Sequence, residues 1–129
     1  ELVRNSDIIC TTTPSTTPVL PDDKELLRGK CIIAIGSYMP EMREIPDAVL
    51  DLVDNVYIEL PYACEESGDL SQPLANGKLT KDRIKLMHEY LVSGEKEIKE
   101  GQTTYFKSVG MGLFDVCIAQ KLYEVAKEK

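Results

Sequence analysis

Residues 30–37 read KCIIAIGS, an apolar run that ends at a glycine and a serine. An unbroken apolar run closed by turn residues is typical of a strand that is buried on both faces of a parallel sheet. Residues 7–11, DIICT, show the same pattern before the threonines and prolines of residues 12–18. Two further strands are predicted over residues 55–60 and 103–107, so four strands define the sheet.

Helical segments are predicted between and after these strands, over residues 46–53, 62–67, 81–92 and 111–126. Pro46 near a first turn and Thr80 as an N-cap supply start signals, and Gly94 stops the third helix. The apolar side of the last helix comprises Phe114, Cys117, Ile118, Leu122, Val125 and Ala126. Strands that alternate with helices predict an α/β fold in which a parallel sheet carries flanking helices.

Length and charge limit the classes of function. The 129 residues are enough for one domain, and 43% of them are hydrophobic, so a buried core is expected. The 22 acidic residues outnumber the 15 basic ones and give a formal net charge of −7. This charge repels phosphate backbones and anionic lipids, so neither a nucleic-acid partner nor a membrane is expected. No apolar run approaches the ~20 residues that span a bilayer, and no leader pattern opens the sequence. We therefore expect a cytoplasmic protein.

Four cysteines are far apart in the sequence and form no C-x-x-C motif: Cys10, Cys31, Cys64 and Cys117. Three of them lie in apolar runs, which predicts buried, reduced thiols rather than disulfides or metal ligands. His88, the one histidine, lies on the apolar side of the predicted 81–92 helix and is interpreted as a packed side chain. No metal site is predicted.

Several charged residues are interpreted as solvent-facing. Arg43 and Glu44 are adjacent in a loop and form a candidate ion pair on its surface. The alternating charges of residues 95–100 predict a solvated loop or helix face. A solvated helix end and turn is predicted for three acids without a partner base or metal ligand at a suitable spacing: Glu65, Glu66 and Asp69.

The carboxyl ends of the strands are the place to look for a site, because open α/β sheets bind ligands at that edge. Thr12 and Thr13 follow the first strand, and short hydroxyls can bond a ligand without filling a cleft, or cap a local turn. Ile35, Gly36 and Ser37 end the second strand. A glycine there allows the backbone to approach a flat ring, although a plain turn gives the same pattern.

The fourth strand leads through Ser108 into the last helix. Free N–H groups at the start of that helix favour a negatively polarised ligand group, whereas a simple capping serine is the alternative. No G-x-G-x-x-G phosphate loop follows any predicted strand.

Four blocks of the sequence carry a family likeness: DIICTTTPSTTPVL at 7–20, AIGSYMPEMREIP at 34–46, EESGDL at 65–70 and TYFKSVGMG at 104–112. In this order they resemble the ornithine cyclodeaminase/mu-crystallin family of nicotinamide-dependent enzymes. The resemblance implies a partial Rossmann-type parallel sheet. Residues 1–110 correspond to the later half of an NAD(P)-binding domain. Residues 111–129 correspond to a C-terminal helix that returns toward a substrate-binding and dimerising domain.

Family members are longer than this chain, so the resemblance implies a fragment that is inactive alone. It implies NAD or NADP as cofactor, a small amino-acid or imino-acid substrate, and a homodimer. It assigns cofactor contacts to six residues and a substrate contact to one: Thr12, Thr13, Ile35, Gly36, Ser37 and Ser108, and Val109 for the substrate.

Two departures from the cyclodeaminases lie in one loop. Tyr38 resembles the position of an aspartate that shuttles a proton in ornithine cyclodeaminases and archaeal alanine dehydrogenases of the family. A phenol, with a pKa of about 10, is a poor base near neutral pH but donates a hydrogen bond. Met42 stands where cyclodeaminases carry a lysine. Tyr38 is therefore the candidate catalytic residue, or else only an aromatic of the cleft wall.

These departures favour an enzyme that reduces small cyclic ketimines. The enzyme alternatives are ornithine cyclodeamination, which yields proline and ammonia, and amino-acid dehydrogenation. A further hypothesis, of a different class, is a non-catalytic cofactor-binding or ligand-binding protein resembling mu-crystallin.

Overall fold

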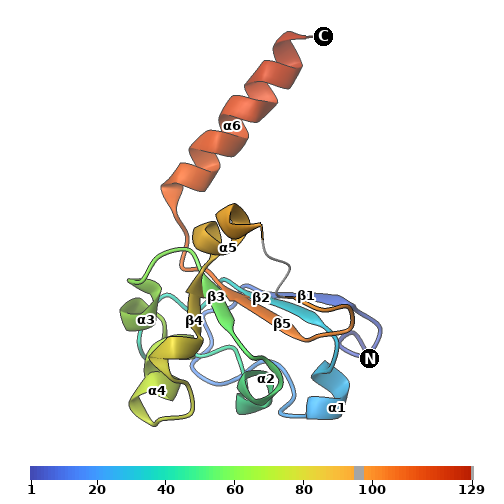
Figure 1. The fold of residues 1–129 in the computed structure, drawn as a ribbon, viewed down its shortest axis with the longest axis vertical. Coiled ribbons are helices and arrows are strands. Elements are labelled where there is room, and N and C mark those ends of the chain that lie inside the picture. Colours follow the sequence, from blue (N-terminus) through green and yellow to red (C-terminus); the bar gives the residue numbers. More distant parts are fainter. Residues whose placement is uncertain (95–97, 129) are drawn as a thin grey trace.

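The computed structural model describes residues 1–94 and 98–128, so residues 95–97 of the predicted solvated charge run lie outside the described part (Figure 1). Five parallel strands form one sheet in the order β1-β2-β5-β3-β4. Their bounds are Ile8–Thr11 for β1, Cys31–Ala34 for β2, Val56–Ile58 for β3, Ile84–Leu86 for β4 and Thr104–Lys107 for β5. The predicted α/β class and all four predicted strands are confirmed.

Within the described residues, six α-helices accompany the strands: α1 (Lys24–Leu27), α2 (Asp47–Leu52), α3 (Ala63–Glu66), α4 (Gly68–Ala75), α5 (Met87–Ser93) and α6 (Gly112–Lys127). Helix α4 was not predicted. Ser67 begins it, because its side-chain oxygen accepts a hydrogen bond from the Asp69 N–H at 3.2 Å. Gly68 therefore starts a helix, whereas the predicted helix over residues 62–67 was expected to end at this glycine.

The strand β4 replaces part of the helix predicted over residues 81–92. The chain forms a 3₁₀ turn at Lys81–Arg83, then β4, and only then α5. Thr80 makes no side-chain capping bond. Strand pairing explains the difference, because β4 pairs with β3 in parallel and half-buries Ile84 and Leu86 on either side of the exposed Lys85. His88 consequently lies in the first turn of the new helix α5 and is exposed, so its predicted packing is wrong.

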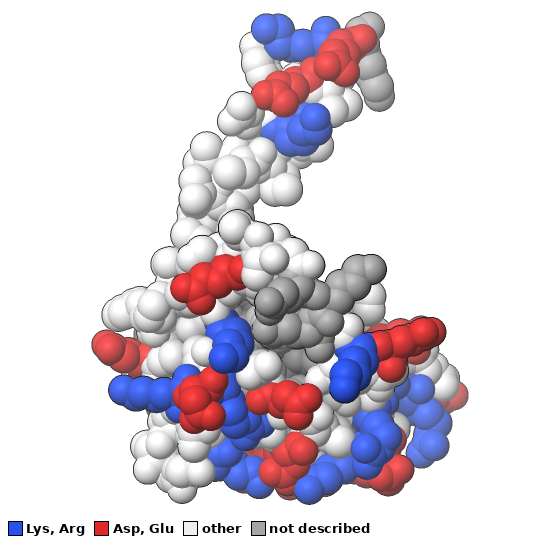
Figure 2. All heavy atoms as spheres, in the orientation of Figure 1, with Lys and Arg blue, Asp and Glu red and all other residues white. Residues whose placement is uncertain are grey.

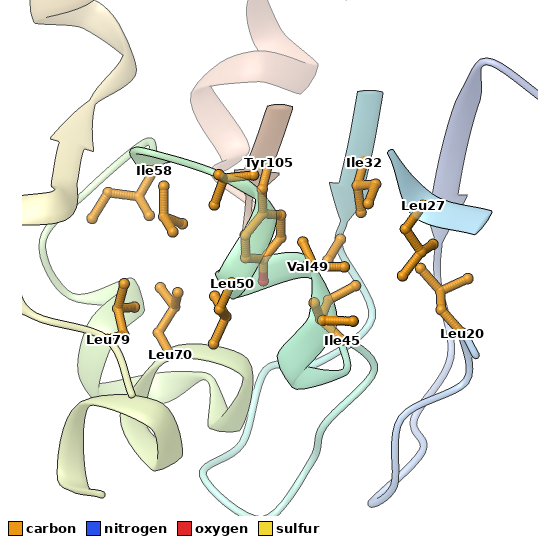
Figure 3. Close-up of a cluster of buried hydrophobic side chains, with 14 of the residues drawn as sticks. Leu20, Leu27, Ile32, Ile45, Val49, Leu50, Ile58, Leu70, Leu79 and Tyr105 are labelled. Carbon is orange, nitrogen blue, oxygen red and sulfur yellow. The ribbon is translucent and has the colours of Figure 1, made fainter. Parts of the chain in front are cut away.

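The core lies on one side of the sheet. Ile32 from β2, Tyr105 from β5 and Ile58 from β3 pack against Val49 of α2 and Leu70 of α4 (Figure 3). Helices α1, α2 and α4 lie along this side (Figure 1). Burial of these side chains away from water is the main stabilising term of such a core.

Burial of the first two strands on both faces is not observed. Ile8 in the edge strand β1 is 66% exposed, and along β2 only alternate residues are buried. This pattern also corrects the prediction for the cysteines. All four are free thiols, but Cys10 and Cys117 are exposed, and Cys31 and Cys64 are only partly buried.

The closing helix α6 projects away from the body of the chain (Figure 1). Its predicted apolar side is exposed, with Phe114 46% and Leu122 65% accessible to solvent. That this helix returns toward a substrate-binding and dimerising domain stays a prediction. None of the helices in the described residues is long and apolar enough to span a bilayer. Acidic and basic side chains are interspersed over the visible face of the body (Figure 2).

Candidate functional site

The carboxyl ends of four strands are aligned at one edge of the sheet. Thr11 of β1 is the register partner of Ala34 in β2, which pairs with Lys107 of β5, which in turn pairs with Ile58 of β3. The loops that follow β1, β2 and β5 therefore start side by side. They bring all eight candidate residues to this edge: Thr12, Thr13, Ile35, Gly36, Ser37, Tyr38, Ser108 and Val109.

The candidate residues differ in how accessible they are. Thr12 is exposed, Ile35 is 41% exposed and Tyr38 is 46% exposed, whereas Thr13 and Val109 are half-buried. These residues present short hydroxyls, an aliphatic side chain and a phenol to a ligand. Hydroxyls beside apolar surface fit the ribose and ring end of a dinucleotide.

The hydroxyl of Ser37 is occupied within the protein. Ser37 is fully buried, and its Oγ donates to the Met42 carbonyl at 2.8 Å and lies 2.8 Å from the Ser67 Oγ. Its side chain thus holds the loop after β2 against the start of α4. The cofactor contact of Ser37 stays a prediction, and its hydroxyl proton is already committed to the Met42 carbonyl.

Gly36 lies where two loops touch. A Cβ on Gly36 would lie 2.2 Å from the Thr13 nitrogen and 2.6 Å from the Thr12 carbonyl carbon. Cβ atoms do not come that close to backbone atoms without a shift of the chain. A glycine is therefore required here by the neighbouring loop, whether or not a ligand ring also approaches it.

Glu44 ties these two loops together. Its side chain is fully buried, and Oε1 accepts from the Thr13 N–H at 2.5 Å. Oε2 accepts from the Gly36 N–H at 2.8 Å and from the Thr11 hydroxyl at 2.9 Å. The predicted surface ion pair with Arg43 is wrong, because Arg43 pairs instead with Asp47. Glu44 bonds to the two backbone N–H groups and the Thr11 hydroxyl.

Asp69 fixes the main chain at Glu44 by hydrogen bonds. It is 1% exposed, and its Oδ1 accepts from the main-chain N–H groups of Glu44 at 2.7 Å and Ile45 at 2.9 Å. The prediction of a solvated Asp69 is therefore wrong, because α4 places this acid in its first turn under the loop. Glu65 is exposed, as predicted, and Glu66 is partly buried.

Lys107, the last residue of β5, completes this buried charged group. Its Nζ lies 3.4 Å from the Asp69 Oδ2, and both side chains are fully buried. Burial raises the pKa of Asp69, against the lowering effect of its amide donors and Lys107. Burial also lowers the pKa of Lys107, although the nearby carboxylates favour its charged form. Such a pair costs more to break than it contributes intact.

A third buried acid holds the loop after β5. Glu59, one residue beyond β3 and 5% exposed, accepts from the Ser108 hydroxyl at 2.8 Å and from the Val109 N–H at 2.7 Å. Both bonds reach the same oxygen, Oε1. The other oxygen, Oε2, is buried and has no hydrogen-bond partner among the described residues.

These three acids were not predicted from the sequence as parts of the candidate site. Glu44 and Asp69 lie within two of the four blocks that carry the family likeness. Glu59 had a signal of its own, an acid placed directly after a buried apolar strand at the edge where ligands bind. Among the described residues, no group of three His, Cys, Asp or Glu side chains is arranged to hold a metal ion.

A mainly apolar cavity of about 430 Å³ lies between β3, β4, α3 and α4. Ile58, Cys64, Leu74 and Leu86 line it, and none of the eight candidate residues does. Glu65 and Lys81 also line it, and Ile58 and Leu86 are the last residues of β3 and β4, so this cavity lies at the β3–β4 end of the same strand edge. The loops after β1, β2 and β5 are the candidate site because they carry all eight candidate residues to the carboxyl ends of the strands, where open α/β sheets bind ligands.

A sequence model of the ornithine cyclodeaminase/mu-crystallin family matches residues 1–129. The chain belongs to this family. A Δ1-pyrroline-2-carboxylate reductase of Bacillus cereus is 38% identical over 132 residues, which cover all of this chain and 40% of that protein. The ketimine reductase mu-crystallin of Rattus norvegicus is 32% identical over 124 residues, covering 96% of this chain and 37% of that protein.

Solved structures of family members share the fold. A probable ornithine cyclodeaminase from Bordetella pertussis superposes with a TM-score of 0.77 at 30% identity, covering 99% of this chain and 42% of that one. The Δ1-pyrroline-2-carboxylate reductase of Thermococcus litoralis, solved with NADH and L-proline, gives a TM-score of 0.78 at 25% identity, covering 98% and 39%. The predicted Rossmann-type fold is confirmed. The chain spans about two-fifths of the length of the curated relatives it matches.

Proposed function

We propose that the protein to which this chain belongs is an NAD(P)-dependent oxidoreductase that reduces small cyclic ketimines. The chain supplies one wall of the cofactor and substrate site. The observation that carries this proposal is the alignment of eight candidate residues at one strand edge, in a chain that matches pyrroline-2-carboxylate reductases over its whole length. Substrates of this class are imino acids such as a pyrroline or piperideine carboxylate.

NAD or NADP fits the loops that the structure describes. The hydroxyls of Thr12 and Thr13, the main chain at Gly36 and the side chain of Ile35 would hold its ribose and nicotinamide end. When bound, the nicotinamide supplies the hydride for the imine carbon. The residues of this chain orient the ring and keep water from it, which is where a protein gains rate in such reactions.

Tyr38 is the proposed proton-handling residue. Tyr38 lies on the loop after β2, directly after Ser37, and is 46% exposed. A phenol there donates a hydrogen bond to the imine nitrogen, which draws electron density from the C=N carbon and so favours hydride addition at that carbon. An aspartate at this position would instead take a proton from a substrate amine, as cyclodeamination requires.

Replacement of Tyr38 by phenylalanine is expected to lower kcat for imine reduction about 100-fold, because the donated hydrogen bond is lost while the ring remains. KM is expected to change little. Turnover is followed by the absorbance of the reduced nicotinamide in the full-length gene product. Tyr62→Phe is the matched control, since Tyr62 is a 61% exposed tyrosine outside the candidate residues. A Tyr38→Phe variant with unchanged kcat would reduce Tyr38 to an aromatic of the cleft wall.

We also propose a homodimer, as the family likeness implies, and a cytoplasmic location, as the sequence analysis predicts. Static light scattering of the full-length gene product at high concentration is expected to give twice the mass of one chain. A monomer under those conditions would contradict the proposed assembly.

A further inference from the structure

Ser108 and Val109, predicted to contact the nicotinamide end of the cofactor and the substrate, both donate hydrogen bonds to one carboxylate oxygen of Glu59. The sheet order places β3 beside β5, so Glu59, just beyond β3, lies next to the loop that opens with Ser108. Its Oε1 accepts the Ser108 hydroxyl at 2.8 Å and the Val109 N–H at 2.7 Å. Hydrogen bonds to an ionised carboxylate are stronger than those between neutral groups, so this contact fixes the loop firmly.

The contact with Glu59 also determines whether the Ser108 hydroxyl donates or accepts a hydrogen bond toward a ligand. A serine hydroxyl has one proton to donate and two lone pairs that accept. The proton of Ser108 goes to Glu59, and one lone pair accepts from the Gly110 N–H at 3.1 Å. A single lone pair is left. Toward any ligand, Ser108 is therefore only an acceptor.

We propose that Glu59 is a positioning residue that makes Ser108 a hydrogen-bond acceptor for an amide N–H of the ligand, and thereby selects a ring that carries a carboxamide. This inference rests on the proposed function, in which Ser108 faces the nicotinamide end of the cofactor. Of the two halves of the nicotinamide carboxamide, only the NH₂ group matches an acceptor. The carbonyl half is left for main-chain N–H groups.

The alternative is that Glu59 only holds a loop. A loop-holding role alone would not distinguish between ligands that differ at one amide group. The selectivity between such ligands is therefore the informative quantity, and it is measured at equilibrium without turnover.

The test compares dissociation constants for the full-length gene product. The probes are NADH and NADPH, their 3-acetylpyridine analogues, in which a methyl group replaces the amide NH₂, and ADP-ribose, which lacks the ring. The wild type is expected to bind the preferred parent cofactor about tenfold more tightly than its acetylpyridine analogue, because the analogue leaves the Ser108 acceptor without a partner. The dissociation constant of ADP-ribose reports the contacts that the site makes with the rest of the cofactor.

Two variants should lose this selectivity and one should keep it. Ser108→Ala and Glu59→Leu are expected to bring the ratio of the two dissociation constants close to one, with ADP-ribose affinity unchanged. Glu59→Gln is expected to keep the ratio, because the amide oxygen can accept the same two bonds and the amide nitrogen takes the place of the unpartnered Oε2. Glu65→Gln is the matched control, because Glu65 is exposed.

The outcomes separate the role of Ser108, the role of Glu59 and the proposed function. Wild-type protein that binds parent cofactor and acetylpyridine analogue equally well would overturn the role of Ser108 as a selective acceptor, while leaving the proposed function intact. Glu59→Leu that keeps the wild-type ratio would overturn the role of Glu59. If Glu59→Leu does not fold, Ser108→Ala and Glu59→Gln still decide the matter. Wild-type protein that binds none of the probes would overturn both the inference and the proposed function.

Discussion

Glu44→Ala is expected to lower the free energy of unfolding by about 3–5 kcal/mol. The physical reason is that the substitution leaves three hydrogen-bond donors without an acceptor. The N–H groups of Thr13 and Gly36 and the hydroxyl of Thr11 all point at the buried Glu44 carboxylate. A buried donor without an acceptor costs about 1–3 kcal/mol.

Urea unfolding of the full-length gene product checks this expectation. Glu41→Ala is the matched control, since Glu41 lies in the same loop and is exposed. It should change stability by less than about 0.5 kcal/mol. Glu44→Gln should lie between the two, because a glutamine accepts at one oxygen and turns a donor toward the remaining N–H. Equal stability of the Glu41 and Glu44 variants would show that the two loops are held by something else.

Gly36→Ala is expected to cost about 2–4 kcal/mol, because the added methyl group would meet the Thr13 main chain at 2.2 Å. Backbone atoms cannot move aside as a flexible side chain does, so one of the two loops must shift. The shift would carry Thr12 and Thr13 away from their present positions. Dinucleotide affinity is therefore expected to fall together with stability.

The control for this variant is Gly112→Ala at the start of α6. Nothing lies within 4 Å of a Cβ built there, so the change should stay within about 1 kcal/mol and leave dinucleotide affinity unchanged. Urea unfolding and a cofactor titration measure the two effects separately. A Gly36→Ala variant as stable as Gly112→Ala would mean that the loops after β1 and β2 are not in close contact.

The position of the candidate site was predictable from the sequence, whereas the buried acids that hold its loops were not. Strands such as Cys31–Ala34 are short apolar runs between turn residues, and parallel strands put their carboxyl ends at one edge. That reasoning places Thr13 and Gly36 near each other without a structure. It says nothing of Glu44, because the burial of a carboxylate depends on donors from segments that meet only in the folded chain.

Local periodicity was misleading where strand pairing decided the outcome. Ile84, Met87, His88 and Leu91 share a face when residues 81–92 are drawn as a helix, which is why one helix was predicted. The pairing of Ile84–Leu86 with β3 takes the first of them into the sheet instead. A short strand of three residues leaves too weak an alternation to be read against a longer helical pattern.

The central claim is tested most directly by supplying the full-length gene product with NADH or NADPH and Δ1-pyrroline-2-carboxylate, with ornithine plus NAD in a parallel reaction. We predict that the imine oxidises the reduced cofactor, seen as a loss of its absorbance, and that proline is formed. Ornithine should give no product. Proline and ammonia from ornithine without net change in the cofactor would contradict the account, since cyclodeamination would then proceed with a tyrosine at position 38.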